Sequence, residues 1–222
     1  MDGHGHLLGL SVRPVAERSK GPYDADVSSF FDVAYEGSPT WEIGHPQPAV
    51  VELEDAGAFG ERVIDVGCGT GDHALFLASH GHEVLGVDLA RAAIDRARSK
   101  ARHRGISAEF LVWDALRLGD LARTFDSALD VGLFHTLGDE ERPVYAASLR
   151  SVLEPEGRGY VLCWSERNTW GYGPRRVGRS EIRQAFEQGW TIDAIEGSRL
   201  ETKLEGGEVH AWLARLRRDS GS

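Results

Sequence analysis

Three glycines at alternate positions, Gly67, Gly69 and Gly71, follow a short apolar run and precede a helical pattern. Glycine lets the backbone turn sharply and approach a bound molecule without a Cβ in the way. Asp65 precedes this loop and Asp72 follows it, whereas the dinucleotide fingerprint has the spacing GxGxxG and needs no preceding acid. The two acids would repel a pyrophosphate, whereas a ligand that carries a positively charged amino-acid group tolerates them. The loop therefore predicts a site for a ligand with a positively charged amino-acid group rather than for a dinucleotide.

Two further acids end later apolar runs. Asp88 ends the run HEVLGVDL, where a carboxylate can accept hydrogen bonds from both hydroxyls of a ribose. Asp114 ends the run SAEFLVWD and could accept a hydrogen bond from an exocyclic amine, with Trp113 or Leu89 against the face of the ring. Together with the glycine loop, these acids predict a nucleoside pocket.

Short apolar runs alternate with helical patterns from residue 62 to residue 166. The strands are expected at 62–67, 82–89, 107–114, 125–135 and 158–166, and the helices at 72–80, 90–104 and 139–153, with a short helix or turn at 116–123. This alternation predicts a parallel sheet covered by helices on both faces, with right-handed crossover connections.

The last forty residues have a different pattern. Residues 180–189 are expected to form a helix with Ser180 as its N-cap. Residues 190–204 and 208–218 follow with only Glu205, Gly206 and Gly207 between them, which is typical of a β-hairpin. The sheet is therefore expected to end in a hairpin that contains one antiparallel strand.

An irregular segment with three prolines, SPTWEIGHPQPAVVEL, starts at Ser38 ahead of the first strand. Residues 26–35 are expected to form a short helix before it, and a second helix is expected after Pro48, which suits the first turn of a helix. Ligands of such sheets bind at the carboxyl ends of the strands. The stiff segment around Trp41 is placed to cover that end. We therefore divide the chain into a flexible lead (1–21), an N-terminal cap over the active site (22–60) and a cofactor-binding domain (61–222).

The composition excludes several classes of function. The chain has 222 residues, of which 41% are hydrophobic, and a formal net charge of −10, which disfavours nucleic acid as a partner. Its two cysteines form no CxxC pair and are expected to be reduced, as in the cytoplasm. No apolar run is long enough to span a membrane. The acids and histidines show no metal-ligand spacing, so no metal is expected.

The stretches DVGCGTGDHALFLASHGHEVLGVDL, WDA and FDSALDVGLFH resemble class I S-adenosylmethionine-dependent methyltransferases, and the resemblance covers about residues 40–217. It implies a Rossmann-like α/β fold with a seven-stranded sheet in the order 3-2-1-4-5-7-6, strand 7 antiparallel, flanked by helices. It implies S-adenosyl-L-methionine as cofactor, with the glycine loop at the methionine part, Asp88 at the ribose and Asp114 at the adenine. The expected cofactor-binding residues are Trp41, Asp65, Gly67, Cys68, Gly69, Gly71, Asp88, Leu89, Asp114, Ala115 and Val131.

The segment TWEIGHPQP resembles the W-D/E-x-G-x-x-x-P signature of thiopurine, thiol and halide methyltransferases, and still more that of small actinobacterial-type methyltransferases of heterocycles and hydroxylated aromatics. The resemblance implies that Trp41 touches both cofactor and acceptor. An indole beside a sulfonium offers a cation–π contact of about 0.5–2 kcal/mol. The alternative is a core tryptophan that pins the segment to the sheet.

Further side chains are expected to line the acceptor site. His135 follows the fourth strand and could act as a general base, since a histidine normally titrates near neutral pH; alternatively it caps the next element or only lines the pocket. Arg175 could attract an anionic acceptor or could pair with surface acids. The expected substrate residues are Trp41, Phe31, Tyr35, His135, Trp170, Tyr172 and Arg175.

The sequence thus predicts an S-adenosylmethionine-dependent methyltransferase that acts on a small molecule, as a monomer or homodimer. It would methylate O, N or S of a phenol, heterocycle or thiol by in-line displacement at the sulfonium. The alternatives are a halide methyltransferase and a cofactor-binding regulatory module without transferase activity. A nucleic-acid methyltransferase is disfavoured, because such enzymes often carry an Asn/Asp-Pro-Pro-aromatic turn where this chain reads Asp130-Val131-Gly132-Leu133.

Overall fold

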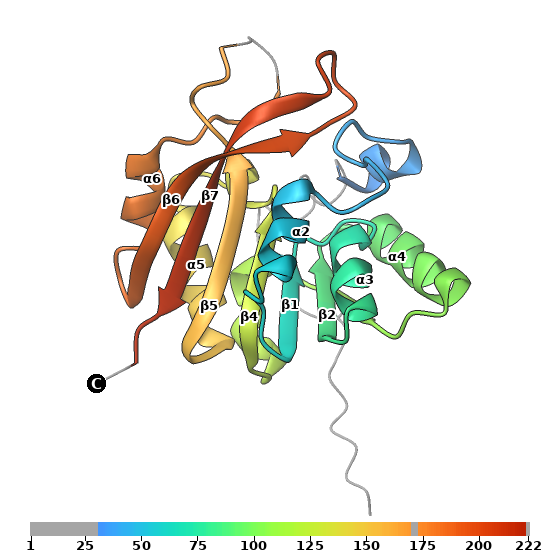
Figure 1. Cartoon of the computed structure of the whole chain (residues 1–222), viewed down its shortest axis with the longest axis horizontal. Helices are drawn as coiled ribbons and strands as arrows, with labels where there is room; N and C mark the ends of the chain where they lie inside the picture. Colours follow the sequence, from blue (N-terminus) through green and yellow to red (C-terminus); the bar gives the residue numbers. More distant parts are fainter. Residues whose placement is uncertain (1–30, 170–172, 221–222) are drawn as a thin grey trace, which may run out of the picture.

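Seven strands form one mixed sheet in the order β3-β2-β1-β4-β5-β7-β6 (Figure 1). The computed structural model describes residues 31–169 and 173–220. Strand β7 runs antiparallel to β5 and β6, and the other neighbours pair in parallel. The expected strand order and the antiparallel seventh strand are confirmed. The strands are β1 (Arg62–Val66), β2 (Glu83–Asp88), β3 (Glu109–Val112), β4 (Phe125–Val131), β5 (Leu153–Trp164), β6 (Trp190–Glu201) and β7 (Glu208–Arg218).

Helices cover both faces of the sheet (Figure 1). One apolar cluster joins the sheet to α2 (Pro48–Asp55), α3 (Asp72–Ser79) and α4 (Arg91–Arg104). A second cluster joins the other face to α5 (Glu141–Ser151), α6 (Arg179–Ala185) and the 3-10 helix η2 (Ala115–Leu121). A second 3-10 helix, η3 (Phe134–Thr136), follows β4, and residues 31–36 are helical.

The alternation of side chains along β1 explains the two clusters. Val63 belongs to the cluster under α2, α3 and α4, whereas Ile64 and Val66 belong to the opposite one. This is the period of two that a strand imposes. Asp65 points to the same side of the strand as Val63, so it is buried on the face covered by α2, α3 and α4, just before the glycine loop.

Two local expectations are wrong. Strand β4 ends at Val131 and does not continue to His135, because Gly132 has a φ of +94° and turns the chain into η3. The Asp130 carboxylate stabilises this turn by accepting the backbone N–H groups of Leu133 (2.8 Å) and Phe134 (3.3 Å). Helix α6 begins at Arg179 with Gly178 as its N-cap rather than Ser180, and the Gly178 N–H donates to the Glu181 carboxylate (2.7 Å).

Residues 31–47, the described part of the predicted cap ahead of α2 and called the cap from here on, lie beside the tip of the β6–β7 hairpin (Figure 1, blue). The Lys203 N–H donates to the Thr40 carbonyl (2.7 Å). The Gln47 amide pairs with both backbone groups of Glu201, at 2.8 Å to its N–H and 2.9 Å to its carbonyl. Residues 1–30 of the predicted lead and cap lie outside the described residues, and the proposed division into lead, cap and domain stays a prediction.

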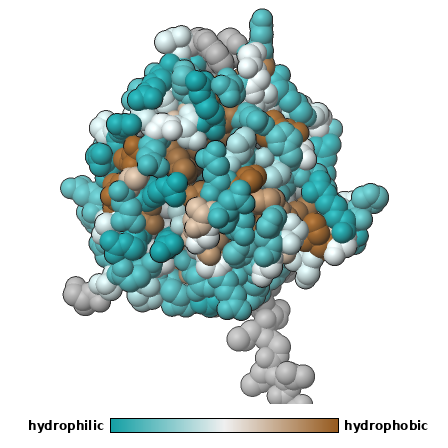
Figure 2. Space-filling view, in the orientation of Figure 1, coloured by the Kyte–Doolittle hydropathy of each residue, from teal (hydrophilic) through white to brown (hydrophobic). Residues whose placement is uncertain are grey.

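Hydrophilic side chains cover most of the face seen in Figure 2, and apolar groups emerge in separate patches. Within residues 31–169 and 173–220, no helix is both long and apolar enough to cross a membrane. The same residues contain no group of three or more histidines, cysteines or acids that could hold a metal ion.

Candidate cofactor and acceptor site

The glycine loop connects β1 to α3, and all three of its glycines adopt positive φ, at +71° for Gly67, +53° for Gly69 and +82° for Gly71. A Cβ at Gly67 would lie 2.8 Å from Leu133, and a Cβ at Gly71 would lie 2.8 Å from the ring of Phe110. The backbone N–H groups of Gly67 and Cys68 donate to the Val87 carbonyl at 2.8 and 3.0 Å, which fixes the loop at the end of β2. Cys68 is buried, and this burial raises the pKa of its thiol.

Asp88 lies between the loop and the start of α4. Its carboxylate accepts the N–H of Gly69 at 2.9 Å and that of Ala90 at 2.8 Å. Burial raises the pKa of Asp88, and these N–H groups oppose the shift. Asp88 and Leu89 are partly exposed. A carboxylate held in this way has lone pairs left for hydroxyl groups of a ligand.

Asp114 and Ala115 follow β3 at the same edge of the sheet. Asp114 is the N-cap of η2 and accepts the N–H of Leu116 at 2.8 Å. Asp114, Ala115 and Val131 are all partly exposed. Trp113 is buried and its indole N–H donates to the Arg117 carbonyl (3.0 Å), so it faces the core, whereas Leu89 lies at the exposed edge.

Two carboxyl groups, Asp65 of β1 and Asp130 of β4, are buried near the carboxyl ends of these neighbouring strands. One oxygen of Asp65, Oδ2, has no hydrogen-bond partner among the described residues. Desolvation, and then the neighbouring Asp130, raise the pKa of Asp65 to about 8. Burial raises the pKa of Asp130 to about 7, although Asp130 accepts the hydroxyl of Tyr145 at 2.8 Å. A buried carboxyl oxygen without a partner suits a positively charged ligand group.

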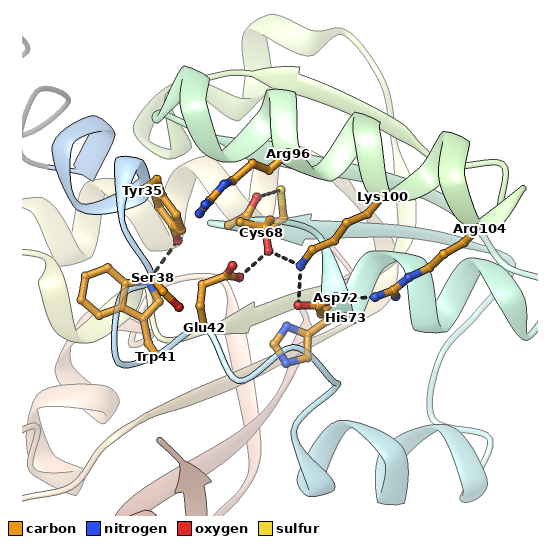
Figure 3. A network of polar contacts seen from close by, with 12 residues as sticks. Tyr35, Ser38, Trp41, Glu42, Cys68, Asp72, His73, Arg96, Lys100 and Arg104 are labelled. Carbon is orange, nitrogen blue, oxygen red and sulfur yellow. Dashed lines mark hydrogen bonds and ion pairs between the residues drawn. The ribbon is translucent and has the colours of Figure 1, made fainter. Parts of the chain in front are cut away.

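Three aromatic rings of the cap pack together, and one of them, Tyr35, lies over the glycine loop. Trp41 packs edge-on against Phe31 and Tyr35, with ring centroids 6.3 and 6.1 Å apart, and its indole N–H donates to the Tyr35 hydroxyl (3.1 Å; Figure 3). A Cβ on Gly69 would lie 2.8 Å from the Tyr35 hydroxyl, so Tyr35 directly covers the loop. Burial and the Asp88 charge raise the pKa of Tyr35. Trp41 is 44% exposed and is therefore not a core residue of this structure.

His135 is buried in η3 beside the end of β5. Its Nδ1 accepts the backbone N–H of Trp164 at 3.2 Å. Burial, and then the charge of Arg142, lower the pKa of His135 to about 3. The ring is therefore neutral near pH 7, and because Nδ1 is an acceptor, the proton lies on Nε2. This arrangement favours a hydrogen-bond donor over a proton acceptor, and the general-base role stays a prediction.

Arg175 takes part in an ion-pair cluster. Its guanidinium lies 2.5 Å from an Asp139 carboxylate oxygen and 2.6 Å from one of Glu181. This placement agrees with the alternative of pairing with surface acids, and a role toward the acceptor stays a prediction. Trp170 and Tyr172, two other expected substrate residues, lie outside the described residues.

The structure adds residues that the sequence did not single out. Trp164 ends β5 next to His135, with ring centroids 6.2 Å apart, and the rule that ligands bind at the carboxyl ends of strands could have pointed to it. Glu42 contacts Thr70 of the glycine loop. Glu42 stands inside the W-E-x-G segment, from which only the tryptophan was assigned a role.

Residues 63–157 match the methyltransferase-domain family. The chain is 31% identical over 193 residues to 2-heptyl-1-hydroxyquinolin-4(1H)-one methyltransferase of Mycobacteroides abscessus, covering 82% of this chain and 85% of that protein. It is 28% identical to the probable thiol methyltransferase 2 of Arabidopsis thaliana, covering 80% of this chain and 76% of that one.

Among solved structures, the fold superposes with a TM-score of 0.81 and 36% identity on one reported as "Conversion of a Disulfide Bond into a Thioacetal Group during Echinomycin Biosynthesis". That match covers 88% of this chain and 93% of the other. These likenesses confirm the resemblance found in the glycine loop and the W-E-x-G segment. The chain belongs to the S-adenosyl-L-methionine-dependent methyltransferases, and S-adenosyl-L-methionine is its cofactor.

Proposed function

We propose that this methyltransferase acts on a small heterocyclic, phenolic or thiol acceptor and methylates an O, N or S atom. The observation that carries the proposal is a cluster of three aromatic rings, Phe31, Tyr35 and Trp41, in which the Tyr35 hydroxyl lies directly over the glycine loop. Flat apolar walls of this kind suit small aromatic ligands. The hydroxyquinolone and thiol methyltransferases among the relatives support this acceptor class.

The cofactor is assigned to the carboxyl ends of β1, β2 and β3. Its amino-acid part would lie at Gly67, Cys68, Gly69 and Gly71, with the ammonium near the unpartnered oxygen of Asp65. Its ribose would bind Asp88, and its adenine would lie between Leu89, Asp114 and Ala115. Val131 ends β4 and would face the reacting centre.

When bound, the cofactor supplies a methyl group on a sulfonium, and the heteroatom of the acceptor displaces the sulfur in line. This chain contributes alignment and exclusion of water, and well-oriented groups can lower a barrier by roughly 7–11 kcal/mol. The half-exposed Trp41 indole is placed to give a cation–π contact of about 0.5–2 kcal/mol. The cap as a whole shields the site from solvent.

The protonation state of His135 limits which classes of acceptor the enzyme can methylate. With its proton on Nε2 and a pKa of about 3, His135 would donate a hydrogen bond to a lone pair and would not remove a proton. The preferred acceptors are then those that are nucleophilic without help at neutral pH, such as thiolates, ionised hydroxy-heterocycles and ring nitrogens. Alcohols and phenols of high pKa should react slowly.

The test begins with calorimetric titration of the protein with S-adenosylmethionine and S-adenosylhomocysteine, and with NAD as a control. We expect micromolar binding of the first two and none of NAD. Asp88→Asn should weaken binding about 10- to 100-fold, since charge-assisted hydrogen bonds contribute about 1.5–3 kcal/mol. Asp95→Asn is the matched control, because Asp95 is exposed on α4 and forms an ion pair with Arg98.

An acceptor panel of hydroxy-heterocycles, phenols, thiols and iodide then separates the alternatives. Methyl transfer to the organic acceptors supports the proposal. Transfer to iodide alone would assign a halide methyltransferase. Binding of cofactor without transfer to any of them would favour the regulatory module, and equal affinity of Asp88→Asn and the wild type would remove Asp88 from the ribose site.

A further inference from the structure

A chain of polar contacts connects the cap to the glycine loop and to α4 (Figure 3). Thr70, between Gly69 and Gly71, is fully buried, and its hydroxyl donates to the Glu42 carboxylate. The ammonium of Lys100 donates to the same hydroxyl oxygen. Lys100 also forms an ion pair with Asp72 at 2.7 Å, and Asp72 lies 3.4 Å from Arg104.

The direction of these hydrogen bonds fixes the Thr70 hydroxyl. Since Lys100 can only donate, the hydroxyl proton of Thr70 points to an acceptor on its other side, which is Glu42. The loop residue is thus held between a donor from α4 and an acceptor from the cap. Removal of either partner would leave a buried hydroxyl that is only partly satisfied.

A second set of contacts, through Trp41 and Tyr35, also connects the cap to the glycine loop. Trp41 precedes Glu42 and binds the Tyr35 hydroxyl, which covers Gly69. The far end of the cap is held by Gln47, whose amide pairs with the backbone of Glu201. A movement of the loop at Gly69 or Thr70 would therefore displace both Tyr35 and Glu42.

The contacts of Thr70 with Glu42 and Lys100, which we call the latch, also border solvent. A groove of about 470 Å³ runs between α4 and the cap, and Ser38, Glu42, Arg96 and Lys100 contribute to its lining. Glu42 and Lys100 are only partly buried. Because water reaches these two groups, the contact can open without exposing the apolar core. This is the property expected of a reversible contact rather than of a core anchor.

We infer that Glu42 is a positioning residue that couples closure of the cap to the cofactor-binding conformation of the glycine loop, through Thr70 and Lys100. The inference rests on the proposed cofactor site. Coupling between two sites is reciprocal. Cofactor binding, which orders the loop, then stabilises the closed cap, and a cap without its latch weakens cofactor binding. The acceptor site, walled by the cap, is completed only after the cofactor is bound.

The test compares Glu42→Ala, Glu42→Gln and Thr70→Val with the wild type, all as the full chain. We expect Glu42→Ala and Thr70→Val each to weaken S-adenosylhomocysteine binding about 5- to 20-fold by calorimetry. The double variant should be no weaker than either single one, because both remove the same contact. Glu42→Gln should stay within about 3-fold of the wild type, since its amide oxygen still accepts the Thr70 hydroxyl. Glu36→Gln is the matched control, because Glu36 is exposed on the same segment.

Hydrogen exchange of residues 38–47 supplies the second readout. In the wild type, S-adenosylhomocysteine should slow this exchange at least 5-fold, and Glu42→Ala should abolish the slowing while the exchange of β1 and β4 is unchanged. Wild-type affinity in Glu42→Ala, or additive losses in the double variant, would overturn the inference.

Failure of the proposed cofactor site is distinguishable from failure of the latch. If the wild type binds no cofactor, the proposed site fails, and the latch is then judged from the cofactor-free protein. There Glu42→Ala should still speed the exchange of residues 38–47 relative to Glu36→Gln, and equal exchange would refute the latch.

Discussion

At the scale of single residues, the hydrogen bond from the Trp164 N–H to His135 argues against His135 as a general base. Its Nδ1 accepts the Trp164 N–H, and the positive charge of Arg142 disfavours the imidazolium form of the ring. We expect the pH profile of kcat/KM between pH 5 and 8 to be the same in the wild type and in His135→Gln, with an acceptor that does not titrate in this range. The measurement is the pH–rate profile of the wild type and of His135→Gln, which keeps an N–H donor.

His135→Ala removes both hydrogen-bonding functions. Loss of a hydrogen bond to the acceptor should lower kcat/KM about 2- to 10-fold, as expected for about 0.5–1.5 kcal/mol. The unsatisfied Trp164 N–H should also lower the free energy of unfolding by about 1–3 kcal/mol. A step near pH 6.5 that is present in the wild type and absent from His135→Gln would restore the general-base role.

At the scale of elements, the glycine loop depends on both backbone conformation and space. Gly71 has a φ of +82°, and a Cβ there would lie 2.8 Å from the ring of Phe110. Gly105, the C-cap of α4, has a φ of +65° and open space around it. We expect Gly71→Ala to lower the free energy of unfolding by about 2–5 kcal/mol, from about 1–2 for the left-handed backbone and about 1–3 for overpacking.

Gly105→Ala should cost only the backbone contribution, about 1–2 kcal/mol. Urea denaturation of both variants measures the difference. Cofactor affinity should fall in Gly71→Ala and stay unchanged in Gly105→Ala. Equal destabilisation of the two variants would show that the Phe110 ring moves to make room for a Cβ at residue 71. Close packing would then not be the reason for a glycine at this position.

Most of the helices, strands and turns could be predicted from the sequence. The alternation of strands and helices, the hairpin around Gly206 and Gly207 and the glycine loop follow local rules of periodicity and turn chemistry, and the structure confirms them. The end of β4 was missed because the positive φ of Gly132 interrupts an apolar run that still reads as a strand. The contact of Glu42 with Thr70 joins residues far apart in the sequence, and only tertiary packing brings them together.

At the scale of the whole molecule, buried titratable groups set the dependence of stability on pH. Asp65 and Asp130 have pKa values raised to about 8 and about 7, so the folded protein keeps two protons that the unfolded chain releases near pH 4. This contribution to stability is complete below about pH 4 and is lost as the pH rises through 7–8. His135 and His73, with pKa values lowered to about 3 and about 4, act in the opposite direction and only below about pH 6.5.

Between about pH 4 and 6.5, a rise in pH lowers the free energy of unfolding through the two carboxyl groups and raises it through the two histidines. Above pH 6.5 only the decrease from the carboxyl groups remains. We therefore expect the free energy of unfolding of the cofactor-free protein to fall by about 2 kcal/mol between pH 6.5 and 8, since one pKa unit corresponds to about 1.4 kcal/mol. Urea denaturation at several pH values measures this fall. Asp65→Asn, which is neutral at every pH, should reduce the slope, and the exposed control Asp95→Asn should leave it unchanged.

Saturating S-adenosylhomocysteine supplies the decisive comparison. If its ammonium lies beside Asp65, as proposed, it favours the ionised carboxylate, and the wild type should lose less stability between pH 6.5 and 8 than it does without ligand. Binding should also release a proton near pH 7, detectable as a dependence of the calorimetric heat on the ionisation enthalpy of the buffer. The same slope with and without ligand, together with no proton release, would place the positive end of the cofactor away from Asp65 and would leave the buried carboxyl pair as a purely structural feature of the sheet.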